Sequence, residues 1–326
     1  MSADSKRSII SFAAIGECMI EMGKQSSSLF SMNFAGDTLN TALYCRRCSD
    51  PLSLSVDYIT ALGNDPFSYD MINEWIKEGI QVTWIRQFPH EKPGLYIIIN
   101  DDVGERYFYY YRSQAAARRL FEGTLGDALC ENLLDFDVLY FSSISLAILL
   151  EAGREKMIQL IQKAHQRGIT ICFDTNYRKR LWHTQEEAYS VITQILPYLD
   201  IALVSFEEEQ KLFGDNTPKV TAERYHQSGV QEVVVKQGEK GYLISDASSN
   251  ADALHYAVDD PVPVSQVVDT TGAGDAFNGA YLAGRLQGVS AEEAAKHAAE
   301  LSMEVIQHKG ALIPLRSMPK YWKLCV

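Results

Sequence analysis

Apolar residues in this chain form short runs, separated by longer stretches in which they recur at helical spacing. Short apolar runs are typical of buried strands, whereas the longer periodic stretches are typical of amphipathic helices. The expected strands are 9–16, 56–62, 138–141, 169–173, 201–204, 232–236 and 242–245. The expected helices are 35–48, 66–77, 151–167, 186–196, 274–286 and 291–307.

This alternation of strands and helices predicts a doubly wound α/β fold. Its sheet should be mostly parallel and covered by helices on both faces. We expect a single domain over residues 1–326, because no repeat, low-complexity tract or long linker interrupts the pattern. Asp37 or Thr38 is expected to cap the helix 35–48.

One region departs from the alternation. The segments Leu95–Asn100 and Arg106–Arg112 are β-branched and aromatic, and only the polar sequence NDDVGE connects them. This pattern predicts a β-hairpin, and we expect it to form a small β-sheet lid from about 18–34 and 94–112.

The hairpin carries more aromatic surface than a two-stranded ribbon can leave in water. Its aromatic residues are Tyr96, Tyr107, Phe108, Tyr109, Tyr110 and Tyr111. We expect one face to cover a ligand and the other to join a second copy in a two-fold homodimer. The alternative is a monomer whose outer lid face packs on its own core.

Composition and charge exclude several classes of function. The net charge of −12 opposes binding to nucleic acid or to an anionic membrane. No apolar run approaches the roughly 20 residues that span a bilayer, and the N-terminus lacks a signal-peptide pattern, so a cytoplasmic protein is expected. Cys45 and Cys48 form a lone CxxC without a second ligand pair, which indicates thiols on a helix.

The segment Val267–Gly288, VVDTTGAGDAFNGAYLAGRLQG, is the most informative. Gly272 and Gly274 allow close backbone approach at a helix N-terminus, where unpaired N–H groups and the helix dipole favour an anion. Asp275 belongs in such a site if it takes a proton from a hydroxyl that attacks a phosphoryl group. The alternative is an ordinary N-terminal helix acid beside a glycine turn.

DTTGAGDAFNGAYL closely resembles the C-terminal signature of the ribokinase-like (PfkB) carbohydrate kinases. The resemblance implies a doubly wound α/β core with a β-sheet lid, and phosphoryl transfer from ATP to a sugar. It implies that Asp275 is the general base. It also implies that the turn from Gly272 is catalytic, with the amides of Ala273, Gly274 and Asp275 forming an anion hole for the transferring group.

Further segments resemble one branch of that family, the 2-keto-3-deoxygluconate kinases. They are GECMIEM (16–22), AGDTLNTALY (35–44), PGLYIIINDDVGERYFYYYRSQAAA (93–117), SSISLAIL (142–149) and FDTNYRKRLW (173–182). The resemblance implies phosphorylation of 2-dehydro-3-deoxy-D-gluconate at its 6-hydroxyl. One departure is Ala35, which stands where the branch has a glycine before Gly36.

A sugar acid carries a carboxylate, which guanidinium forks bind well. Arg112 ends the aromatic strand, and Arg178 lies beyond the strand 169–173, at the edge where open α/β sheets bind ligands. A plain surface arginine remains the alternative for both. By resemblance, the substrate-binding residues are Gly36, Asp37, Asn40, Tyr96, Tyr110, Arg112, Ile144, Arg178 and Asp275.

The sequence KQGEKG, 236–241, resembles the loop that approaches ATP in this family, with a plain hairpin turn as the alternative. By resemblance, the nucleotide-binding residues are Asn176, Ser205, Lys236, Gly238, Gly241, Gly272 and Gly274. Glu208 aligns with the acid of an NxxE motif that organises water around magnesium, although Ser205 replaces the asparagine. We expect ATP with Mg²⁺ held mainly by phosphates and waters, and the resemblance also allows a monovalent cation.

Two other functions stay open. One is another PfkB sugar kinase, either fructokinase-like or specific for 2-keto-3-deoxygalactonate, and the other is a non-catalytic sugar-binding protein on this fold. Arg112 and Arg178 argue against a neutral sugar, which offers them no carboxylate. Asp275 argues against a mere binding protein, which needs no base.

Overall fold

The computed structural model describes residues 9–100, 106–247, 254–256 and 262–319. Its main sheet has eight strands in the order β14-β13-β12-β11-β10-β9-β1-β4. The strands from β4 to β12 pair in parallel, β13 pairs antiparallel with β12, and β14 pairs antiparallel with β13. The strands are β1 (Ile10–Ile15), β4 (Leu54–Ile59), β9 (Val138–Ser142), β10 (Thr170–Asp174), β11 (Ile201–Ser205), β12 (Glu232–Lys236), β13 (Tyr242–Asp246) and β14 (Leu254–Tyr256).

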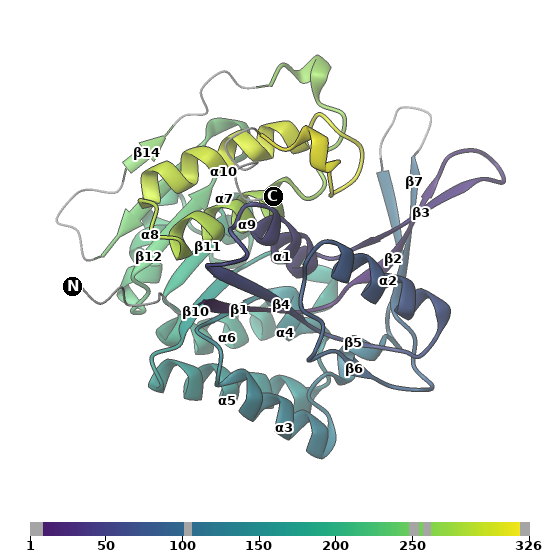
Figure 1. Cartoon of the computed structure of the whole chain (residues 1–326). Helices are drawn as coiled ribbons and strands as arrows, with labels where there is room; N and C mark the ends of the chain where they lie inside the picture. The colour runs from purple at the N-terminus through teal and green to yellow at the C-terminus, as the bar shows by residue number, and fades with distance from the viewer. Residues whose placement is uncertain (1–8, 101–105, 248–253, 257–261, 320–326) are drawn as a thin grey trace, which may run out of the picture.

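Helices cover both faces of this sheet (Figure 1). Side chains alternate along each strand, so Ala13 and Ile15 of β1 join one apolar layer while Phe12 and Ala14 join the other. The first layer contains α3 (Gly123–Leu133), α4 (Ser143–Ile148), α5 (Glu151–Gln166), α6 (Gln185–Ile195), α7 (Phe206–Phe213) and α8 (Pro218–Gln227). The second contains α1 (Asp37–Arg47), α2 (Pro66–Lys77), α9 (Ala273–Leu286) and α10 (Ala291–Val305). The predicted fold class is confirmed.

The predicted elements lie within two residues of those observed, with one exception. The run 56–62 is not a single strand, because β4 ends at Ile59 and β5 (Ala61–Leu62) pairs instead with β6 (Arg86–Gln87). The expected helices do not include α3, α4, α7 or α8. For α8 the signal was present: Thr217 caps the helix by accepting a hydrogen bond from the Val220 amide, and Pro218 follows it.

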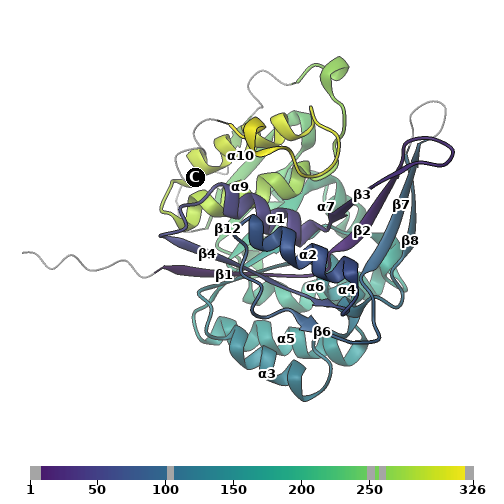
Figure 2. The ribbon, with the colours of Figure 1, turned by 45° about the vertical axis from the view of Figure 1, so that its right-hand side comes forward.

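A second sheet extends from one end of the core (Figure 2). Its strands are β2 (Met19–Lys24), β3 (Phe30–Ala35), β7 (Gly94–Asn100) and β8 (Arg106–Tyr111), in the order β3-β2-β7-β8. The strands β7 and β8 pair antiparallel, with Tyr96 opposite Tyr110. The connection predicted between them, 101–105, lies outside the described residues. We call this second sheet the lid.

Among the described residues, no helix combines the length and the apolar character needed to cross a membrane.

Candidate active site

The chain changes its direction of winding between two neighbouring strands. From β1 it passes through the lid into α1, on one face of the main sheet, whereas from β9 it enters α4 and α5 on the other. Because β1 and β9 are adjacent, these connections diverge and leave a crevice at the carboxyl ends, where open α/β sheets bind ligands. A cavity of about 1150 Å³ lies at this end of the sheet, bounded by the lid, the ends of β10–β12 and the start of α9.

Gly272 shapes the turn that begins α9. Its φ of +76° is in the left-handed region, and a Cβ there would lie 2.7 Å from the Cβ of Ala311, so the turn requires glycine. Ala273, Gly274 and Asp275 form the first turn of the helix, where N–H groups have no intrahelical acceptor. The turn lines the cavity and therefore presents it with an anion-binding helix N-terminus.

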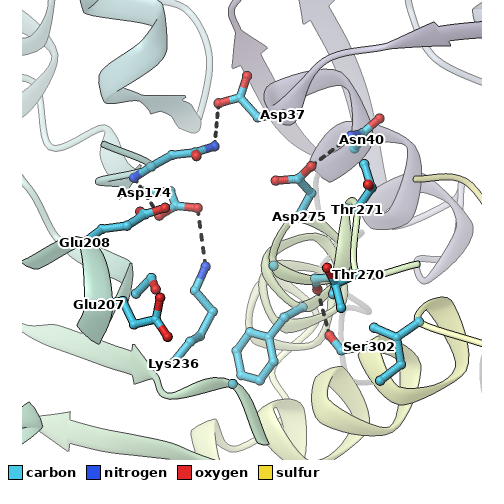
Figure 3. Close-up of a pocket in the computed structure, with 18 of the residues that line it drawn as sticks. Asp37, Asn40, Asp174, Glu207, Glu208, Lys236, Thr270, Thr271, Asp275 and Ser302 are labelled. Atoms are coloured by element: carbon cyan, nitrogen blue, oxygen red, sulfur yellow. Dashed lines mark hydrogen bonds and ion pairs between the residues drawn. The ribbon is translucent and has the colours of Figure 1, made fainter. Parts of the chain in front are cut away.

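The half-buried carboxylate of Asp275 lies at this turn, facing Asn40 of α1 (Figure 3). Asn40 Nδ2 donates a hydrogen bond to Asp275 Oδ2 at 2.8 Å. Burial, and next the negative charge of Asp37, raise the pKa of Asp275 to about 7, although the Asn40 hydrogen bond opposes the shift. A carboxylate with a pKa near neutrality is well matched to accept a proton from a hydroxyl.

Asp37 connects the ends of two neighbouring strands beside Asp275. Its Oδ2 accepts hydrogen bonds from Ser142 Oγ, at the end of β9, and from Asn176 Nδ2, after β10, the second at 3.0 Å. The expectation that Asp37 or Thr38 caps α1 is therefore wrong. Gly36 occupies the N-cap position without a side-chain hydrogen bond, and Asp37 is the first helical residue, with its carboxylate bound across the crevice.

Lys236, at the end of β12, anchors another side of the cavity. Its Nζ donates to Asn278 Oδ1 at 2.8 Å and to Asp174 Oδ2 at 3.3 Å, while Asn278 Nδ2 donates to Asp174 Oδ2 at 2.7 Å. The position of a Cβ on Gly274 lies 3.7 Å from Lys236 Nζ. This network brings a positive charge close to the anion-binding turn (Figure 3).

The lid covers the cavity with one of its two faces. Met19, Tyr96, Phe108 and Tyr110 line the cavity, and the rings of Tyr96 and Tyr110 stack with centroids 5.5 Å apart. Tyr96 also donates a hydrogen bond to Glu21 of β2. The intervening residues Tyr107, Tyr109 and Tyr111 are exposed, as strand alternation requires.

The opposite end of the cavity is partly apolar. Its lining includes Tyr242 of β13, Phe277 of α9, and Ala299, Met303 and Ile306 on or just beyond α10. Between β12 and β13 the chain turns through Gly238–Lys240, with Gly238 at φ +60° and Gly241 at φ +94°. An apolar wall beside a glycine-containing turn suits a flat base followed by phosphates.

A family model described as pfkB family carbohydrate kinase matches residues 10–318. The chain belongs to this family. It is 43% identical over 310 residues to a 2-dehydro-3-deoxygluconokinase of Escherichia coli strain K12, a match that covers 94% of this chain and 98% of that protein. It is 42% identical over 307 residues to the 2-dehydro-3-deoxygluconokinase of Dickeya dadantii strain 3937, with the same coverage of each chain.

Solved structures agree on the fold. An E. coli structure described as a ribokinase II, in complex with ATP and Mg²⁺, superposes with a TM-score of 0.79 at 22% identity, covering 97% of this chain and 98% of that one. The resemblance to the PfkB kinases predicted from the sequence is confirmed.

Most residues that the sequence assigned to ligands line the cavity of this pfkB family kinase, and their individual roles stay predictions. They are Gly36, Asp37, Asn40, Tyr96, Tyr110, Ile144, Asn176, Arg178, Ser205, Glu208, Lys236, Gly238, Gly241, Gly272, Ala273, Gly274 and Asp275.

Arg112 is the exception, because it does not line the cavity. Its guanidinium pairs with Glu17, which follows β1 and is almost fully buried. Burial raises the pKa of Glu17, and Arg112 opposes that shift. In this structure the buried carboxylate of Glu17 takes the guanidinium of Arg112 as its counter-charge, and the expected contact between Arg112 and the ligand stays a prediction.

Arg178 and Glu208 do line the cavity, but as partners of each other. Arg178 Nη1 lies 2.5 Å from Glu208 Oε1, and Glu208 also accepts from the Tyr177 amide at 3.2 Å. In the described part of the chain, no group of three or more His, Cys, Asp or Glu residues is arranged to hold a metal ion. Glu207 and Glu208 both lie on the cavity wall (Figure 3). Their carboxylates are suited to bind the water shell of a metal ion that is itself coordinated by the phosphates of a nucleotide.

Sequence analysis overlooked Asp174 and Asn278. Asp174 ends β10 at the carboxyl edge of the sheet, and the rule that singled out Arg178 applies equally to it. Asn278 lies three residues after Asp275, on the same side of α9. No local sequence pattern indicated a role for Glu17. Its pairing with Arg112 depends on the tertiary fold, which brings the chain after β8 back beside the end of β1.

Proposed function

We propose that the chain transfers the γ-phosphoryl group of ATP to the 6-hydroxyl of 2-dehydro-3-deoxy-D-gluconate, giving 2-dehydro-3-deoxy-6-phosphogluconate. The observation that carries this proposal is 43% identity to a kinase with that substrate name, along 98% of its length. The arrangement of Asp275 at an anion-binding turn supports it.

In the proposed reaction, Asp275 accepts the proton of the attacking hydroxyl. Its pKa of about 7 leaves a substantial fraction ionised at neutral pH, and Asn40 holds one carboxylate oxygen. The amides of Ala273, Gly274 and Asp275 stabilise the oxygens of the transferring group, with Lys236 close by. The lid excludes water that would otherwise accept the phosphoryl group.

ATP enters at the end of the cavity that holds Gly238 and Gly241. The base lies against the apolar wall of Tyr242, Phe277 and Met303, so that its phosphates point toward the start of α9. Magnesium, bound with ATP as in the E. coli ribokinase II structure, neutralises charge on the phosphates. Glu208, or the adjacent Glu207, would contact its water shell.

Three further expectations accompany this function and stay predictions. They are a homodimer formed through the lids, a cytoplasmic location and a monovalent cation. The exposed outer lid residues Tyr107, Tyr109 and Tyr111 support the first.

A coupled ADP-release assay across a panel of sugars tests the function. The panel contains 2-dehydro-3-deoxy-D-gluconate, its galactonate epimer, fructose and ribose. We expect the highest kcat/KM for the gluconate-derived acid. Preference for fructose would favour the neutral-sugar kinase, and no ADP release with any sugar would favour a binding protein.

A further inference from the structure

A buried cluster of polar side chains joins α7 and α8 behind the cavity. Its centre is Glu209, which is fully buried and stands three residues before Leu212 on the core-facing side of α7. An amphipathic helix normally has an apolar residue at such a position. Arg224 of α8 supplies the counter-charge, donating from Nη2 to Glu209 Oε2. A buried ion pair adds little net stability compared with apolar packing, so Glu209 calls for another explanation.

Glu209 is connected to the cavity wall through Thr175. The Thr175 hydroxyl donates to Glu209 Oε1, and the Tyr225 hydroxyl, 2.9 Å from Thr175 Oγ1, donates to the same carboxylate oxygen at 3.1 Å. All three side chains are fully buried. Because β11 pairs with β10, α7, which begins directly after β11, starts beside the residues that follow β10. The fold therefore brings Glu209 to Thr175.

The two residues that flank Thr175 face the cavity. Asp174 and Asn176 line its wall, whereas the side chain of Thr175 lies within the buried cluster. Asp174 accepts a hydrogen bond from Lys236. Asn176 donates one to Asp37. Asn176 has a φ of +32°, a conformation that is uncommon outside glycine and persists where the surrounding structure fixes it.

We propose that Glu209 is a positioning residue for phosphoryl transfer, which fixes the segment 174–176 through the hydroxyl of Thr175. The segment in turn holds Lys236 beside the anion-binding turn and Asp37 beside the base. This inference rests on the proposed function. Loosening the segment should slow turnover more than it weakens the binding of either substrate. The alternative is that the cluster only packs α7 and α8 together.

The test removes the contact without emptying the space. Thr175→Val keeps the shape of the side chain and deletes the hydroxyl. We expect its kcat to fall about 10- to 30-fold, because small displacements of the groups around a reacting centre cost rate steeply. KM for ATP and for the sugar should change less than about threefold. Thr175→Ser keeps the hydroxyl and should keep kcat within about threefold.

Thr221→Val is the matched control. Thr221 is also fully buried, and its hydroxyl donates at 2.9 Å to Asp215, the second carboxylate partner of Arg224. The same chemical change then falls on the same network but spares the contact with the segment 174–176, so kcat should stay within about twofold. Unfolding in urea compares the stability of the two variants. An equal fall in kcat in both would mean that the cluster only maintains the fold, and would overturn the inference.

A double-mutant cycle tests whether Glu209 acts through Thr175. Glu209→Gln keeps the shape of the side chain, removes its charge and should lower kcat to a similar extent. Because both substitutions weaken one contact, the double variant should be at most about threefold slower than the slower single variant. Effects on kcat that multiply, as for independent sites, would overturn the inference. If Glu209→Gln does not fold, the valine and serine variants of Thr175 still decide it: unchanged kcat in Thr175→Val, or an equal loss in Thr175→Ser, overturns it.

The choice of substrate separates this inference from the function on which it rests. The variants are assayed with the sugar of the panel that the unmodified enzyme phosphorylates best. A different preferred sugar would overturn the substrate assignment, while the comparison of Thr175→Val with the unmodified enzyme would still decide the role of Glu209. If no sugar supports ADP release, the proposed function and the role of Glu209 fail together.

Discussion

The two sides of the cavity are built in different ways. On the core side, Asp275, Lys236 and Asp174 are held by charged or amide partners; Asp174 is buried and Asp275 is half-buried. On the lid side, Tyr96, Tyr110 and Phe108 contact one another mainly through their rings, and Phe108 is 37% exposed.

This difference suggests a division of tasks, in which the core side of the cavity carries out the chemistry and the lid side recognises the sugar. Groups that stabilise a transition state are most effective when their positions are fixed before the ligand arrives, as hydrogen bonds fix those of the core side. Aromatic rings on a sheet that extends from the core can adjust as they cover a ligand. Substitutions on the core side should therefore act mainly on turnover, and substitutions on the lid side mainly on sugar binding.

The largest effect is expected from Asp275→Asn. The amide has nearly the same shape but cannot accept the hydroxyl proton, so kcat should fall about 10²- to 10⁴-fold. ATP binding, followed by calorimetry, should be largely kept. Asp127→Asn, an exposed acid on α3 outside the cavity, is the control. Near-normal turnover in Asp275→Asn would contradict the assignment of the base.

A second prediction concerns the root of the lid, where Glu17 and Arg112 form a buried pair. Arg112→Ala leaves a buried carboxylate without its counter-charge, which should lower the free energy of unfolding by about 3 kcal/mol, measured in urea. Replacing both residues with methionine should restore most of this loss.

Kinetics of the same variant sharpen the comparison between the two sides. If Arg112→Ala keeps its stability but raises KM for the sugar acid, then Arg112 leaves Glu17 to bind the ligand. That result would support the role that the sequence pattern assigned to it.

The sequence predicted the parallel core well for a physical reason. Strands such as β9 and β11 are buried on both faces, so they appear as uninterrupted apolar runs between helices. The short helices escaped because their signals are local: α4 has only six residues, and its capping box joins Ser142 and Ser145. The break at Thr60 is set by pairing with β6, which no local pattern reveals.

The candidate site was predictable where one segment carries the chemistry. Gly272–Asp275 form a continuous motif, and their placement at a helix N-terminus follows from the adjoining helical pattern. The partners of Arg112 and Arg178 could not be predicted in this way. Both ion pairs join residues distant in sequence, so they depend on the tertiary fold.

The titration of Asp275 offers a third prediction. Because its raised pKa is about 7, the ionised base is lost as pH falls through 7, and kcat/KM should then drop about tenfold per pH unit. An unperturbed aspartate, with a pKa near 3.9, would give a flat profile over this range.

Neighbouring substitutions show which carboxylate is responsible. Asp37→Asn removes a charge that raises the pKa of Asp275, so the acidic limb of the pH profile, where kcat/KM falls, should move to lower pH. Asn40→Ala removes a hydrogen bond that stabilises the ionised carboxylate and should move this acidic limb to higher pH. The phosphate titration of ATP, near pH 6, is common to all variants. A limb at the same pH in all three enzymes would exclude Asp275 as its source.

The smallest effect on turnover is expected on the outer face of the lid. Cross-strand pairing places Met32, Met22, Ile97 and Tyr109 in one row across all four strands, and Tyr109 is 50% exposed. Such a row can be buried by the same row of a second copy related by a two-fold axis. Light scattering at micromolar concentration should give a dimer mass, and Tyr109→Lys should shift it toward the monomer because a charge opposes burial.

The cavity is lined by the other face of the lid, so Tyr109→Lys leaves every lining side chain unchanged. The kcat should therefore stay within about twofold, while KM for the sugar rises if the second copy steadies the lid. Lys77→Gln, on the last turn of α2, is a surface control. A monomeric mass for the unmodified enzyme at full activity would rule out the lid dimer. The comparison between the core side and the lid side of the cavity would then hold for a single chain, whose lid covers the ligand without contact to a second copy.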